Sequence, residues 1–211
     1  MAPSPLRSFI IRVFLLLPVM FAAWFFLGSL LATTCSWLAR GLFAVLEPGL
    51  LDNFKPDGVT LEVVTRIPVS TLGGAYASMK GTLAFDTRPM LFGYGTPFFL
   101  ALFFAAPRAW GKQPWQLVVA ILALVAIQLW GLAFDIYKNI LFSFGPGVAA
   151  TLEMGLYARS FVAYGYQLGT LILPVIGPVA LWFGLFNQHW RKLVGQQPRS
   201  NRGPRHSLKQ R

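Results

Sequence analysis

Long apolar runs separated by shorter polar segments make up most of this sequence. A membrane-spanning helix needs about 20 mainly apolar residues, and four runs meet or approach that length. These runs are residues 13–32, 90–106, 115–134 and 161–186. The second is short, whereas the fourth is long and contains Pro174 and Pro178, which favours a tilted or kinked helix. The pattern predicts an all-α polytopic membrane protein, in which residues 1–211 form a single membrane domain with about four transmembrane helices.

The composition excludes the soluble and fibrous classes of protein. Hydrophobic residues make up 55% of the chain and charged residues 12%, whereas a typical soluble domain carries roughly 25% charged residues. So few charges cannot cover the surface of a water-soluble protein of 211 residues. A disulfide scaffold is excluded as well, because the chain has one cysteine.

The first apolar run has an alternative interpretation as a cleaved signal peptide, because it follows Arg7 and Arg12. It is longer than the apolar region of such peptides, roughly 7–15 residues, and no Ala-x-Ala cleavage site follows it. Residues 31–35 are similar to a lipoprotein signal, but Thr34 stands where a Gly or Ala is required. A spanning helix is therefore favoured over cleavage, and lipidation of Cys35 is disfavoured.

The distribution of charge predicts the orientation. Eleven of the 18 Lys and Arg residues lie before residue 13, between 107 and 114, or after 186. All seven acidic residues lie in the two longer connections, 33–89 and 135–160. Because cytoplasmic segments carry the excess of basic residues, both termini are predicted to be cytoplasmic. We expect a multi-pass protein of the bacterial inner (cytoplasmic) membrane.

The net charge of +11 is concentrated in the last part of the chain. Residues 187–211 hold seven basic residues and no acidic one, which predicts a disordered, basic cytoplasmic tail. Such a tail is attracted to anionic membrane lipids, by about 1 kcal/mol for each cation near the surface. Nucleic-acid binding requires more than charge, so no nucleic-acid partner is expected.

The segments between the first two runs predict a small extracytoplasmic structure. Residues 36–51 have a roughly helical apolar pattern, which indicates an extension of the first helix along the outer interface. Residues 52–89 form an extracytoplasmic loop in which 59–67 and 82–87 are candidate strands. A two-stranded hairpin is marginally stable alone. It must therefore rest on the membrane domain, on the interfacial helix or on another protein.

Two features of the later runs predict contacts between helices. Gly165, Gly169 and Gly177 would let another helix approach the fourth span closely, and packing within this chain is favoured over homodimerisation. Asp135 and Lys138, three residues apart, are expected to form a capping ion pair at the end of the third span.

The sequence offers no recognisable catalytic centre. Cys35 would need a histidine base, but the two histidines, His189 and His206, fall in the predicted cytoplasmic tail. No metal-ligand cluster or phosphate-binding loop is present, so neither a metal nor a cofactor is expected. No Asp or Glu lies inside a predicted span, which also disfavours an ion-coupled transporter. We expect a protein that is not an enzyme.

The segment that enters the second span, residues 86–97, is dense in Gly, Pro, Tyr and charge. It is either a rigid entry turn or a recognition site, whose candidate partner-binding residues are Asp86, Arg88, Gly93, Tyr94 and Gly95. With its pattern Pro-x-x-x-Gly-Tyr-Gly-x-Pro opening an apolar span, the stretch 59–106 resembles the exosortase H-associated membrane protein family.

This resemblance implies an accessory role beside an exosortase-like membrane cysteine transpeptidase, which sorts proteins with C-terminal anchoring tails. Membrane lipids would be the other partners. The expected function is a non-enzymatic accessory or scaffold of a protein-sorting system. The alternative is a small transporter or channel subunit for a lipid or solute. A polar lumen would favour the alternative, whereas an exposed apolar groove facing a partner would favour the accessory role.

Overall fold

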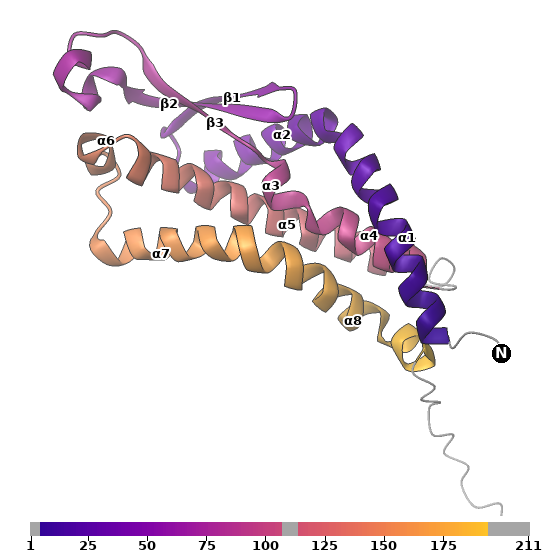
Figure 1. Cartoon of the computed structure of the whole chain (residues 1–211). Helices are drawn as coiled ribbons and strands as arrows, with labels where there is room; N and C mark the ends of the chain where they lie inside the picture. The colour runs from indigo at the N-terminus through magenta and orange to yellow at the C-terminus, as the bar shows by residue number, and fades with distance from the viewer. Residues whose placement is uncertain (1–4, 107–113, 194–211) are drawn as a thin grey trace, which may run out of the picture.

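The structure, a computed structural model, describes residues 5–106 and 114–193, with side chains as far as Phe186 (Figure 1). The predicted connection at 107–113 and the part of the predicted tail from 194 onward lie outside the described residues. Within them, the helices are α1 (Pro5–Phe26), α2 (Gly28–Leu46), α3 (Met90–Gly93), α4 (Gly95–Ala105), α5 (Pro114–Lys138), α6 (Pro146–Ala150), α7 (Leu156–Gln167) and α8 (Leu173–Leu193). The strands are β1 (Leu51–Asp57), β2 (Thr60–Pro68) and β3 (Thr82–Thr87).

Two long helices continue through π-helical turns, in which the backbone is wider than in an α-helix. Asn139–Ser143 extends α5, and Leu168–Ile172 joins α7 to α8. In the described part of the chain, four helices are long and apolar enough to cross a membrane. They are Pro5–Phe26, Gly28–Leu46, Pro114–Ser143 and Leu156–Phe186. The prediction of an all-α polytopic membrane protein with a small β region is confirmed.

The first predicted span differs from the structure. Residues 13–32 are divided between α1 and α2, because the helix is interrupted at Leu27. At this point the backbone lies against other elements: a Cβ on Gly28 would be 2.7 Å from Met90 Sδ and 2.9 Å from Val59 Cγ1. The predicted interfacial helix, 36–51, is the second half of α2, which ends at Leu46, before Pro48 and Gly49.

The second predicted span, residues 90–106, is a short apolar helical stretch from Met90 to Ala105. Residues 90–106 form two helices, α3 and α4, of which α4 has 11 residues. At 1.5 Å per residue, the stretch from Met90 to Ala105 is about 24 Å long, somewhat less than a hydrocarbon layer of about 30 Å. Its Phe99 and Phe103 are buried among α1 and α8, where the ring of Phe9 stacks on Trp182 at 5.3 Å.

The loop predicted to be extracytoplasmic contains three strands instead of the two predicted. They form an antiparallel sheet of order β1-β2-β3. Strands β2 and β3 coincide with the predicted ones, whereas β1 was not predicted. Its sequence contains Lys55, Pro56 and Asp57 and shows no alternation of apolar and polar residues.

One hydrophobic core joins this sheet to the helices beneath it. Leu61 and Val63 of β2 are fully buried and belong to the same cluster as residues of α2 and α5. The ring of Phe43 in α2 lies 6.0 Å from that of Phe54 in β1 and 5.7 Å from that of Tyr137 in α5. The sheet therefore rests on the helices of its own chain, as Figure 1 shows.

Glycines bring the last long helix close to α5. A Cβ on Gly165 would be 2.2 Å from the ring of Phe134, and one on Gly177 would be 2.7 Å from Ile127 Cδ1. At Gly169 an added Cβ would collide with backbone, because it would lie 2.7 Å from the Cα of Gly131. Only residues without side chains can make contacts this close. Helices in lipid associate through contacts of this kind.

We expect Gly169→Ala to lower the thermal unfolding temperature in detergent. The added methyl group meets the backbone of Gly131, and overpacking of this kind costs about 1–3 kcal/mol. Gly41→Ala in α2 is the matched control, because no atom lies within 4 Å of its added Cβ. Equal unfolding temperatures for the two variants would contradict this description of the helix contact.

Candidate functional site

The structure separates the residues of the predicted recognition site into two groups. Asp86, in β3, and Arg88, just after it, are exposed, whereas Gly93 and Gly95 are buried and Tyr94 is half-buried. The first group is available to another protein. The second group makes contacts inside this chain.

The two buried glycines allow close approach between α3, α4, α5 and α8. A Cβ on Gly93 would be 2.8 Å from the amide of Gln128, and one on Gly95 would be 2.7 Å from the carbonyl oxygen of Pro174. Gln128 is buried and its Nε2 donates a hydrogen bond to the carbonyl oxygen of Pro89, at 3.1 Å. Both glycines therefore position the entry segment against the long helices.

Tyr94 satisfies a carbonyl group that a proline leaves free. In an α-helix, the N–H of residue 174 would bond the carbonyl of Thr170, but Pro174 has no N–H. The Tyr94 hydroxyl donates a hydrogen bond to this carbonyl oxygen at 3.1 Å. In a membrane helix such carbonyl groups need a partner, so Tyr94 has a structural role at the π-helical turn before α8.

A polar junction connects the sheet to α5. It consists of Thr87, Asp135, Lys138, Asn139 and Tyr166. The Thr87 hydroxyl donates to Asp135 Oδ2 at 2.5 Å, Lys138 Nζ lies 2.8 Å from Oδ1, and Asn139 donates to Oδ2 at 3.4 Å. Lys138 Nζ also lies 4.3 Å from the centroid of the Tyr166 ring, within the range of a cation–π contact.

The predicted ion pair between Asp135 and Lys138 forms, but the prediction of a cap at the end of a helix was wrong. The helix continues beyond Lys138 as far as Ser143, and Asp135 is 7% exposed. The carboxylate is buried because Thr87, at the end of β3, and Asn139 cover it along with Lys138. This position makes Asp135 a link between two parts of the fold.

Little in the sequence indicated the contact between Thr87 and Asp135. Thr87 and Asp135 are 48 residues apart, and nothing in the pattern around Thr87 indicates that its hydroxyl is buried. The relevant signal was the position of Asp135, directly after a 20-residue apolar run, where a carboxylate near the membrane needs partners.

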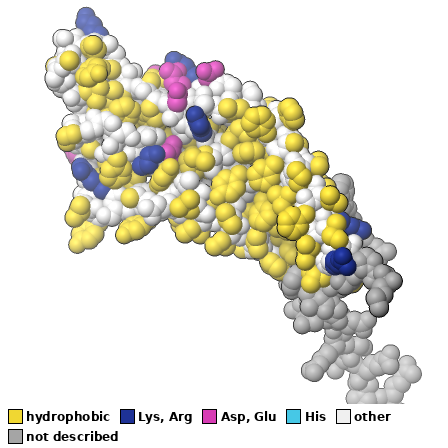
Figure 2. Space-filling model, in the orientation of Figure 1, with side chains coloured by type: hydrophobic (Ala, Val, Ile, Leu, Met, Phe, Trp, Pro, Cys, Tyr) yellow, Lys and Arg dark blue, Asp and Glu magenta, His cyan; other side chains and the backbone are white. Residues whose placement is uncertain are grey.

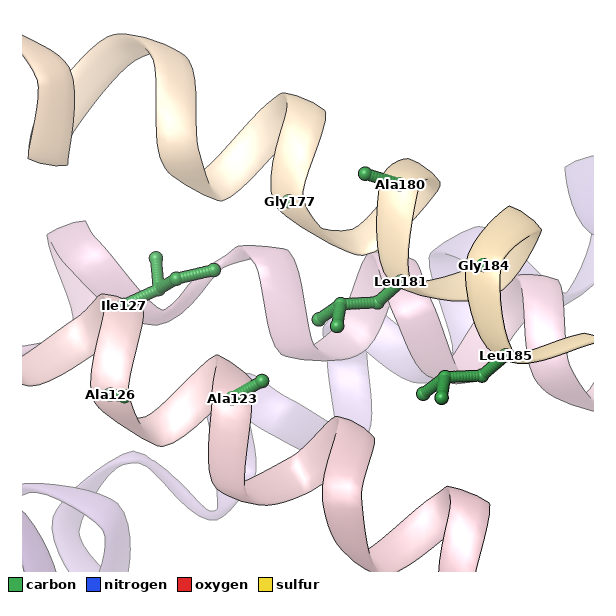
Figure 3. A pocket seen from close by; sticks show the side chains of 8 residues that line it. All are labelled: Ala123, Ala126, Ile127, Gly177, Ala180, Leu181, Gly184 and Leu185. Atoms are coloured by element: carbon green, nitrogen blue, oxygen red, sulfur yellow. The ribbon is translucent and has the colours of Figure 1, made fainter.

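An apolar groove lies between α5 and α8. The small side chains that line it leave a space of about 540 Å³, which Figure 3 shows from close by. Its lining residues are Ala123, Ala126 and Ile127 of α5, with Gly177, Ala180, Leu181, Gly184 and Leu185 of α8. None of them carries a charge or a polar side chain. A Cβ on Gly184 would meet no atom within 4 Å, so the groove is open at that position.

The residues considered for catalysis are not assembled in the described structure. Cys35 lies in the middle of α2 and is 6% exposed. His206 lies outside the described residues, and the side chain of His189 is among those that the structure leaves out. Among the residues that it describes, no group of three or more His, Cys, Asp or Glu could hold a metal ion.

The comparisons with known proteins identify the family. A family model described as exosortase H-associated membrane protein matches residues 3–189. No curated protein and no solved structure matches the chain.

We expect Thr87→Val to destabilise the protein by about 1.5–3 kcal/mol, the usual contribution of a hydrogen bond to a charged group. Valine keeps the shape of threonine but removes the shorter of the two hydrogen bonds to Oδ2 of the buried Asp135 carboxylate, leaving only the longer one from Asn139. Thermal or denaturant unfolding in detergent measures the effect. Thr82→Val, an exposed position on the same strand, should change stability by less than about 0.5 kcal/mol. Similar effects at the two positions would show that the hydroxyl of Thr87 does not stabilise the junction.

Proposed function

The chain belongs to the exosortase H-associated membrane protein family, and we propose that it is a non-enzymatic accessory or scaffold protein of a bacterial exosortase-type protein-sorting system. The family description names an association with an exosortase, which supports a membrane protein as the partner. The match extends over residues 3–189, so it includes both the helices and the sheet.

The observation that carries this proposal is the apolar groove between α5 and α8. Helices associate in lipid where small residues let them approach closely, and this groove presents Ala180 and Gly184 on an open, apolar surface. A transporter or channel subunit for a solute would need a polar path through the helices. The groove has no polar side chain, so it favours the accessory function over that alternative.

The entry segment supplies a second contact surface in this proposal. Asp86, in β3, and Arg88, just after it, are exposed and are candidates for direct contact with the partner. Gly93, Tyr94 and Gly95 act indirectly, since their contacts with Gln128, Thr170 and Pro174 hold the segment in place.

The absence of enzymatic activity is part of the proposal. Its support is the position of Cys35, which is buried in the middle of α2. We expect Cys35→Ser to retain expression and association with the partner.

We also propose that the protein lies in the inner membrane with cytoplasmic termini. Figure 2 shows acidic side chains at the end of the molecule that carries the sheet, where Lys and Arg side chains also lie, and basic side chains without acidic ones beside the start of α1 at the other end. Hydrophobic side chains cover the surface between these two ends. The end at the start of α1, which on this face carries basic and no acidic side chains, supports the cytoplasmic side predicted from the distribution of Lys and Arg.

The orientation can be tested by labelling single cysteines in intact cells, in a Cys35→Ser background. A membrane-impermeant maleimide should label Ser78→Cys, which lies in the exposed turn before β3, and should not label Ser200→Cys. Labelling of Ser200→Cys from outside the inner membrane would overturn the proposed orientation. Labelling of both after the membrane is permeabilised is the control for reactivity.

The proposed function can be tested by purifying a tagged chain from native membranes. We expect an exosortase-type transpeptidase to copurify with the wild-type protein. Ala180→Leu should reduce its recovery about tenfold, because it enlarges an exposed small residue that lines the groove. The matched control is Val175→Leu, which enlarges an exposed residue of the same helix outside the groove.

Both variants should accumulate in the membrane and unfold at the wild-type temperature, since neither residue is buried. Copurification that is unaffected by Ala180→Leu would remove the groove from the interface. A wild-type chain that brings down no transpeptidase, or that conducts a solute when reconstituted alone, would contradict the accessory function itself.

A further inference from the structure

The two edges of the sheet differ in how they are protected from other strands. Strand β1 carries Lys55 and Pro56, and its pairing with β2 is irregular between Leu51 and Asn53. It also packs against α2, where Arg40 Nη2 donates a hydrogen bond to Asn53 Oδ1 at 2.6 Å. Charged side chains, proline and bulges at an edge are the features that prevent pairing with a further strand.

Strand β3, at the opposite edge, has fewer of these features: it carries one charged residue, Asp86, and its pairing with β2 shifts register only between Ala84 and Thr82. Its sequence, TLAFDT, contains no Pro, Lys or Arg and has no irregularity in its pairing from Ala84 to Thr87. Thr82, Ala84 and Asp86 are exposed. In the part of the chain that the structure describes, the backbone groups of β3 form no hydrogen bond with any element other than β2.

The register shows which backbone groups face this open edge. The N–H of Arg66 in β2 donates to the carbonyl of Leu50 at 2.9 Å, so the backbone of Arg66 faces the β1 side. Backbone groups of successive residues point to alternate sides of a strand. Those of Thr65, Val63 and Leu61 therefore face β3.

The residues of β3 that face β2 follow from the pairing. Val63 is paired with Phe85, and Leu61 with Thr87. The backbone groups of these two β3 residues consequently point to β2, and those of the alternate residues, Ala84 and Asp86, point away from it. Ala84 and Asp86 therefore present N–H and C=O groups at two-residue spacing along the open edge.

We propose that the open edge of β3 binds an extended segment of the partner transpeptidase, which adds to the sheet as a fourth strand. This inference rests on the proposed function for the identity of the partner. An extended polypeptide is the occupant whose own N–H and C=O groups repeat at the spacing of the edge. A lipid, a small solute or a helix has no such row of donors and acceptors.

Two further features of β3 suit this role. Asp86 carries its charge on the exposed side of the strand, where it favours a cationic residue opposite it in the added strand. The end of the strand is fixed, because the Thr87 hydroxyl is bonded to the buried Asp135. A strand that is already held in place loses little conformational freedom on binding, which favours affinity.

The test removes one backbone donor from the open edge. Ala84→Pro deletes an N–H group that faces away from β2, and proline is tolerated at this kind of edge position. We expect recovery of the transpeptidase with the tagged chain to fall about tenfold. Ala84→Val is the matched control, since it keeps the N–H group and a β-strand preference, and its recovery should stay within about twofold of wild type.

A second measurement does not depend on whether the proline variant folds. In a Cys35→Ser background, a short thiol crosslinker at Ala84→Cys should join the chain to the transpeptidase, whereas Lys55→Cys on the protected edge should not. Crosslinks from position 84 to a sorted protein, to a second copy of this chain or to its own residues would overturn the proposal. So would equal crosslinking from positions 84 and 55.

The outcomes separate this inference from the proposed function. If the transpeptidase copurifies with the wild-type chain and with folded Ala84→Pro alike, the open edge is not the contact and the accessory function stands. If it copurifies with neither, the accessory function fails, and the inference about β3 fails with it.

Discussion

The buried carboxylate of Asp135 is the constraint on which the arrangement of this protein depends. A charge at the boundary between helix and sheet is costly unless it is paired and hydrogen-bonded. Here the carboxylate receives hydrogen bonds from Thr87 and Lys138, so the end of β3 and the helix α5 are held at one point. A small sheet is stable where its hydrophobic face is covered, and this link, with the apolar core around Leu61 and Val63, attaches that face to the helices.

The helices beneath the sheet are held together by a different interaction. Lipid tails are as apolar as leucine, so burial of apolar surface does not drive helices together in a membrane. Close packing through small residues does, and Gly169 against Gly131 is the clearest contact of this kind. By the same reasoning, the α5–α8 groove is suited to contact with another helix, because its Ala180 and Gly184 are small and uncovered. Gly169 already has a partner helix within the chain, whereas Ala180 and Gly184 are small residues suited to a partner helix but have no helix packed on them in the described structure.

The fold class could be predicted from the sequence, because apolar runs of this length are explained by helices that span a membrane. Strands β2 and β3 were predicted from their β-branched and alternating residues. The break at Leu27 has no proline to mark it in the sequence, and the close contacts beside it, from Gly28 to Met90 and Val59, join segments that are distant in the sequence. Strand β1 was missed because neighbouring elements, and not its own residues, give it a strand conformation.

For the candidate site, the sequence identified the right segment but not the roles of its residues. It grouped Asp86 and Arg88 with Gly93, Tyr94 and Gly95, because all five are close in the chain. The partners of Tyr94 and Gly95 are Thr170 and Pro174, about 80 residues later, and no local pattern indicates such contacts. Partner contact at Asp86 and Arg88 stays a prediction.

The sheet and the membrane helices behave as one rigid body. This body presents fixed surfaces to a partner. The most direct test is amide hydrogen exchange of the purified protein in lipid nanodiscs, followed residue by residue. The account predicts that the amides of Val63 and Leu61 exchange as slowly as those near Asp135 in α5, and that Thr87→Val accelerates both sets together. If these β2 amides exchange as fast as those of the exposed turn at 74–81 while α5 stays protected, the sheet moves independently and the central claim is contradicted.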